Sequence, residues 1–139
     1  MSLLTPIKHR FVVLFITVAA GGFSLVSFAQ ENLNDAWAGQ WIAEGTPFQI
    51  KVEIEDNVLK VTSIESMGFE WTSEEATPNG NTVEVAVDYI TGGVSGVIRA
   101  ELLNETTGVL SVKTCTPEFM VSCALSKGRQ AIFKKVTAP

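Results

Sequence analysis

Residues 48–55 read FQIKVEIE, in which four apolar side chains alternate without a break with four polar ones. Strict alternation with a period of two predicts a β-strand that buries one face and exposes the other. EDN at residues 55–57 is a tight-turn signal, and VLKVTSI at 58–64 has the composition of a partner strand. This part of the chain therefore predicts a β-hairpin with one buried face.

The same alternation of short strands and turns runs through most of the chain. Beyond the first hairpin, we expect strands at GQWIAE (39–44), FEWTSEEA (69–76), TVEVAVDYI (82–90), VSGVIRAEL (94–102), VLSVKTC (109–115) and RQAIFKKV (129–136). EFMVSCALSK (118–127) is the best candidate for a short turn of helix. About eight sequential strands predict an all-β domain, and such a meander protects its edges best by closing into an up-and-down barrel. An open sandwich of the same strands is the alternative.

The first 29 residues differ from the rest and are typical of a signal peptide. A short basic segment (Lys8 to Arg10) precedes the apolar run FVVLFITVAAGGFSLV, and SFA supplies small residues at Ser27 and Ala29 before a cut. An uncleaved membrane anchor is the alternative, although the apolar run is short for a membrane span. We expect cleavage, a leader over residues 30–37 that is flexible, and a barrel domain over 38–136.

Cleavage would leave 110 residues, enough for a single domain. This part contains eight basic and fifteen acidic residues, a net charge of −7. Such a balance lacks the basic surface that nucleic-acid binding needs and disfavours anionic membranes. We therefore predict no nucleic-acid partner and no integral membrane protein after cleavage.

The two cysteines, Cys115 and Cys123, lie close together in CTPEFMVSC. In an exported chain, a close and even pair is most simply a disulfide. Its spacing is far from the redox motif C-x-x-C, so we expect the bond to hold a loop in place. The protein is accordingly predicted to be periplasmic or secreted.

Gly39-Gln40-Trp41 opens the first expected strand, and in this setting it resembles the G-x-W signature of lipocalin-like (calycin) barrels. The pattern of residues 38–136 and the ending AIFKKV extend the resemblance. The resemblance implies that Trp41 packs across the closed end of the barrel against a basic side chain near the end of the last strand. The start of the first strand lies beside the end of the last strand in such a barrel, so Lys134 or Lys135 is a better partner for Trp41 than Arg129.

Within this family, the chain looks most like small lipocalin-like domains of bacterial exported proteins. It is also similar to periplasmic inhibitors of secreted metalloproteases, in which the segment before the barrel enters the protease cleft. That resemblance would give residues 30–35, QENLND, an inhibitory role. Avidin-like barrels share the size and a late F-x-K-V strand, but their biotin contacts have no match in this sequence.

Catalysis finds little support in the sequence. The single histidine, His9, is removed with the signal peptide, which excludes Ser–His and Cys–His systems and histidine metal sites from the remaining chain. Glu74 and Glu75 are adjacent on an expected strand and would point to opposite faces. We predict a protein that is not an enzyme and needs no cofactor or metal.

Binding is better supported, because large residues lie on the inward faces of the expected strands. Phe69, Trp71 and Tyr89 are candidate ligand contacts, and Gly96 marks the place where a cavity would open. The default alternative is that these aromatics simply fill the barrel, since side chains alone can close an eight-stranded interior. Phe119 in the bridged loop is a possible protein contact or a cover for the barrel mouth.

Taken together, the residues predict a non-enzymatic, exported lipocalin-like barrel that binds a small apolar ligand or serves as an accessory interaction domain. The alternative is an inhibitor of a secreted metalloprotease that acts through its N-terminal leader. The expected partners are thus a small hydrophobic ligand or a secreted protein.

Overall fold

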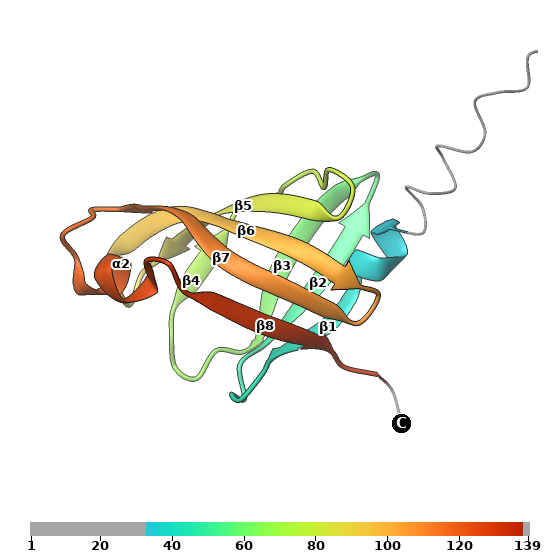
Figure 1. Cartoon of the computed structure of the whole chain (residues 1–139), viewed down its shortest axis with the longest axis horizontal. Helices are drawn as coiled ribbons and strands as arrows, with labels where there is room; N and C mark the ends of the chain where they lie inside the picture. The colour runs from blue at the N-terminus through green and yellow to red at the C-terminus, as the bar shows by residue number, and fades with distance from the viewer. Residues whose placement is uncertain (1–32, 138–139) are drawn as a thin grey trace, which may run out of the picture.

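A computed structural model describes residues 33–137 of the chain. The signal peptide expected over residues 1–29 and the first part of the leader lie outside this range. Eight antiparallel strands form one sheet, with a short helix before the last strand (Figure 1). The elements are β1 (Gly39–Ala43), β2 (Gln49–Glu55), β3 (Val58–Glu65), β4 (Trp71–Ser73), β5 (Thr82–Tyr89), β6 (Val94–Asn104), β7 (Thr107–Thr116), α2 (Val121–Ser126) and β8 (Gln130–Lys135).

The strands follow one another around a barrel in the order β3-β2-β1-β8-β7-β6-β5-β4. The last strand pairs with the first, with Trp41 opposite Lys135, so the expected closure of a meander is confirmed. Between β3 and β4 the barrel is joined more sparsely, by a bridge between Leu59 and Ala76 and by a hydrogen bond from Ser73 Oγ to the Val61 carbonyl. The chain is therefore a nearly closed up-and-down barrel, not an open sandwich.

The hairpin expected from FQIKVEIE and VLKVTSI is present as β2 and β3. Alternate residues of β2 (Ile50 and Val52) are buried, while Lys51 between them and Glu53 after them are exposed. The turn after β2 uses positive φ at Asp56 and Asn57, as the compact hairpin turns with a right-handed twist require. The period-two pattern thus fixes which face of this hairpin lines the barrel interior.

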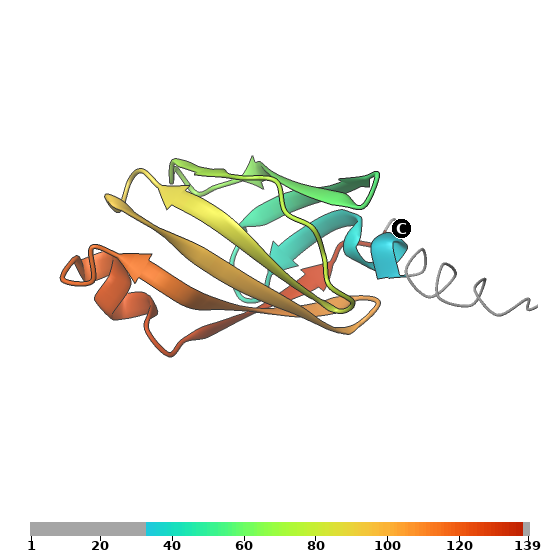
Figure 2. The same cartoon turned by 90° about the horizontal axis from the view of Figure 1, so that it is seen from above.

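Two opposite ends of the barrel differ in construction (Figures 1 and 2). The helical turn of residues 33–37 lies at one end, and α2 lies at the other. The flexible leader expected up to residue 37 is thus wrong for its described part, because Trp37 is buried at the barrel's end and anchors this turn. Its Nε1 donates a hydrogen bond to the Gly80 carbonyl, in the turn before β5.

In the described part of the chain, no helix has both the length and the apolar character needed to cross a membrane.

Candidate functional site

The interior of the barrel contains a cavity of about 750 Å³. Volumes of roughly 300–1,000 Å³ are typical of pockets for small ligands. Side chains alone therefore do not fill the interior, which was the alternative to a ligand cavity. The apolar lining of the cavity includes Trp37, Trp41, Phe48, Ile50, Val52, Leu59, Val61, Phe69, Trp71, Val83, Val85, Val87, Ile98, Ala100, Leu102, Leu110, Val112, Ala131 and Phe133.

Small inward-facing residues are the physical reason that space remains. Gly96, Ala100, Gly108 and Ala131 all line the cavity, on three neighbouring strands. Ala100 and Leu110 are paired across β6 and β7, and Leu110 is paired with Ala131 of β8. Glycine and alanine at four inward positions on β6, β7 and β8 therefore leave room inside this side of the barrel.

Gly96 is a position that only glycine can occupy without movement of the backbone. A Cβ atom there would lie 2.0 Å from the Thr114 carbonyl oxygen on the adjacent strand. The ladder between β6 and β7 is irregular next to it, between Val97 and Ile98. Gly96 therefore serves a close approach of β6 and β7, and it also lines the cavity.

Trp41 closes one end of the cavity. Its side chain is 4% exposed, and its Nε1 donates a hydrogen bond to the Trp37 carbonyl over 3.0 Å. The Lys135 Nζ lies 5.1 Å from the centre of the Trp41 ring, a distance typical of a cation–π contact. Gly39 beside it has a φ of +135°, a conformation that favours glycine, and its surface packs on the Lys135 stem.

The two lysines expected near Trp41 have separate positions. Lys135 reaches over the indole ring and donates a hydrogen bond to the Ala36 carbonyl over 2.7 Å, which ties the helical turn to β8. Lys134, its neighbour in the strand, donates instead to Thr107 Oγ1. The geometry thus distinguishes two residues that the sequence left as alternatives.

Burial at this end lowers the pKa of Lys135 from its ordinary value of 10.5, against the opposing charges of Glu105 and Asp35. The folded state then holds this proton less tightly than the unfolded chain does. The positive charge of Lys135 therefore destabilises the folded state at pH values below the folded-state pKa. This destabilisation becomes smaller as the pH rises toward the pKa of Lys135 in the unfolded chain.

We expect the wild type to gain stability relative to Lys135→Met as the pH rises from about 8 to about 10.5, because only the wild type loses this charge. Urea unfolding of both proteins at the two pH values measures the difference, and all other titrating groups are shared and cancel. A stability difference that moves the opposite way would contradict the assignment.

Aromatic side chains line the cavity toward the other end. The rings of Phe69 and Tyr89 meet edge to face with centres 6.0 Å apart, and the rings of Phe48 and Trp71 lie 6.2 Å apart. The structure thus places the candidate contacts Phe69, Trp71 and Tyr89 on one cavity wall, together with Phe48, which we did not single out from the sequence. Their contact with a ligand stays a prediction.

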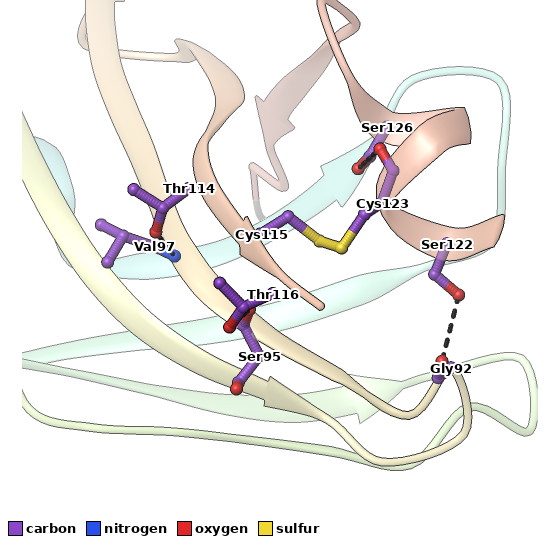
Figure 3. The surroundings of a disulfide bond; sticks show 9 residues. All are labelled: Gly92, Ser95, Val97, Thr114, Cys115, Thr116, Ser122, Cys123 and Ser126. Atoms are coloured by element: carbon purple, nitrogen blue, oxygen red, sulfur yellow. Dashed lines mark hydrogen bonds between the residues drawn. A yellow bond between two sulfur atoms is a disulfide. The ribbon is translucent and has the colours of Figure 1, made fainter. Parts of the chain in front are cut away.

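The disulfide between Cys115 and Cys123 is confirmed, and it fastens α2 to the end of β7 at this second end of the barrel (Figure 3). Ser122 Oγ of α2 also donates a hydrogen bond to the Gly92 carbonyl in the hairpin between β5 and β6 (Figure 3). Ser122, Leu125 and Ser126 of α2 contribute to the cavity wall. α2 is therefore held as a lip at the mouth of the cavity.

Phe119 lies just before α2 and is 84% exposed. It therefore does not cover the barrel mouth, the role that the sequence left open for it. A protein contact at Phe119 stays a prediction.

The sequence analysis missed the polar residues of the mouth. Ser95, Ser111, Ser126, Arg129 and Gln130 all line the cavity near α2 and the strands beside it. Arg129 could have been found, because it precedes Ala131 and Phe133 in the same period of two. Among residues 33–137, no group of three or more His, Cys, Asp or Glu side chains is placed to hold a metal.

The chain matches no protein-family model, and no curated protein matches it significantly. Among solved structures, it is similar to pallilysin of Treponema pallidum, with a TM-score of 0.49 and 9% identity. The alignment covers 82% of this chain and 92% of that chain. What this barrel does is therefore inferred from its own residues.

Proposed function

We propose that the protein binds a small apolar ligand inside its barrel, as the lipocalin-like resemblance of Gly39 and Trp41 implies. The observation that carries the proposal is the cavity of about 750 Å³ with its mainly apolar wall. An apolar ligand that enters such a space gains free energy in proportion to the apolar surface removed from water, about 25 cal/mol per Å².

The construction of the two ends supports entry from one side. Trp41 and Trp37 are nearly fully buried and hydrogen-bonded at the closed end. At the other end, Phe69 and Leu125 line the cavity and yet are 42% and 61% exposed. Residues that face both the cavity and solvent mark its mouth, beside α2.

The disulfide is compatible with an extracytoplasmic location, since oxidising compartments preserve such bonds. We therefore place the binding activity in the periplasm or in the secreted fraction. The inhibitor alternative gains no support from the described residues. The helical turn of 33–37 is held against the barrel through Trp37 and Lys135. The last residues of this turn therefore do not project from the barrel as an inhibitory segment would.

Titration with the neutral fluorescent probe N-phenylnaphthylamine tests the proposal. Wild-type protein should bind it saturably, and Ala131→Phe should weaken binding about tenfold or more, because a ring replaces a methyl group in a fitted apolar space. Ile132→Phe is the matched control, since Ile132 is the next residue of β8, is 41% exposed and does not line the cavity.

Thermal melting of both variants establishes that they fold. Equal binding by Ala131→Phe and the wild type would place the probe outside the barrel and contradict the proposal. Absence of saturable binding by the wild type would contradict it as well.

A further inference from the structure

The charge of the cavity wall is carried by a single residue. Arg129 is the one charged side chain among the residues that line the cavity in the described part of the chain. None of the acidic residues in that part contributes to the wall, although the whole chain has fifteen. The wall is therefore cationic in a protein whose net charge is negative.

Arg129 lies at the mouth and not at the closed end. It stands between α2 and β8, and its backbone N–H donates a hydrogen bond to the Ser126 carbonyl at the end of α2. The disulfide and the Ser122 hydrogen bond hold α2 to the end of β7 and to the hairpin between β5 and β6 (Figure 3). The attachment of α2 therefore fixes the position of the Arg129 backbone.

Polar groups accompany Arg129, while the other end is apolar. Ser126, Ser111 and Gln130 line the cavity beside it, and Ser111 is paired with Gln130 across β7 and β8. Trp41 and Phe133 form the wall farther along, at the closed end. The cavity is therefore amphiphilic along its length, with hydrogen-bond donors gathered at the mouth.

No carboxylate of the described residues neutralises this guanidinium. The ion pairs found there join Lys51 to Glu53 and Lys113 to Glu84, on the outside of the barrel. A guanidinium offers a fork of N–H donors whose geometry matches a carboxylate or phosphate. An anionic group placed at the mouth would meet a free cationic partner.

We propose that the ligand is a single-chain amphiphile with an anionic head, whose chain occupies the barrel and whose head binds Arg129. This inference rests on the proposed function and adds the chemical class of the ligand.

The length of the cavity suits one acyl chain. Leu102 and Gly96, six residues apart on β6, both line it. At about 3.3 Å per residue and a strand tilt of about 40°, they are separated by about 15 Å along the barrel axis. Half of the roughly 30 Å hydrocarbon core of a bilayer, the reach of one chain, has the same length.

Dodecanoate and dodecanol form a matched pair of ligands, because they share the chain and differ in the charge of the head. We expect wild-type protein at neutral pH to bind the acid about tenfold more tightly than the alcohol, since charge-assisted hydrogen bonds are stronger than neutral ones. Displacement of N-phenylnaphthylamine measures both. Arg129→Gln should reduce this preference to nearly one, while dodecanol binding stays unchanged.

Lys127→Gln is the matched control, because it removes one positive charge two residues away at a side chain that does not line the cavity. It should keep the preference for the acid. Comparison of dodecanoate with a phosphate-headed amphiphile of the same chain length shows whether Arg129 prefers a carboxylate or binds either anion.

The two proposals fail in different ways. If N-phenylnaphthylamine itself does not bind, the proposed function is wrong. If it binds but neither dodecanoate nor dodecanol displaces it, the single-chain class of ligand is overturned and the proposed function stands. If both bind with equal affinity to the wild type, or if Arg129→Gln leaves the preference unchanged, the barrel binds apolar chains but the role of Arg129 is overturned. The wild-type comparison of the acid with the alcohol does not depend on the folding of any variant.

Discussion

Trp41→Ala is expected to lower the free energy of unfolding by about 3–5 kcal/mol, the range for truncation of a buried aromatic residue. The indole is 4% exposed and closes one end of the barrel. Its loss would remove the hydrogen bond to the Trp37 carbonyl and the ring beneath Lys135. Urea unfolding followed by circular dichroism measures the change.

Trp71→Ala provides the matched control for this substitution. Trp71 lies in the three-residue strand β4, is only partly buried and donates its indole hydrogen bond to Ser66 Oγ. Because Trp71 is only partly buried, truncation there should cost clearly less than at Trp41, which is 4% exposed. A loss below about 1 kcal/mol at Trp41, or an equal loss at both positions, would show that Trp41 does not hold the closed end.

The order of strands was predictable because it follows from local signals, and the closed end was implied by the lipocalin-like resemblance of Gly39 and Trp41. Alternation in FQIKVEIE defines the inward face, and the short turns leave little choice of neighbour for each strand. Closure between Trp41 and Lys135 follows from the meander itself. The inward face and the strand order depend on residues near one another in sequence, which is why a single sequence reveals them.

The cavity was not predictable in the same way. A period of two tells which side chains point inward, but not how much space is left between strands that lie far apart in sequence. Here the small residues Ala100 of β6, Gly108 of β7 and Ala131 of β8 come together in the cavity wall. The end of the leader was expected to be flexible for a related reason, because strand alternation does not extend to the helical turn of 33–37, which buries Trp37.

Loss of the disulfide, as in the double variant Cys115→Ser/Cys123→Ser, is expected to cost about 2–3 kcal/mol, because the bond closes a short loop and restricts the unfolded chain. The double variant avoids the free thiol that a single substitution would leave. Reduction of the wild type should produce the same loss, and agreement between the two separates the effect of the bond from that of the serines.

The destabilisation caused by loss of the disulfide should be concentrated in α2. This helix has six residues, and its N-terminus has no side-chain cap. Isolated helices of fewer than about 12–15 residues are marginal in water. Val121 and Leu125 are 70% and 61% exposed, so burial contributes little to holding the helix. Without the disulfide, the hydrogen bond from Ser122 to Gly92 is a weak substitute.

Amide hydrogen exchange distinguishes local from global destabilisation in the double variant. We expect residues 121–126 to lose protection, while the paired strands β6 and β7 retain theirs under native conditions. Because Arg129 follows α2 directly, the variant should also lose part of its preference for dodecanoate over dodecanol. Unchanged protection across α2 would show that packing, and not the disulfide, holds the lip of the cavity.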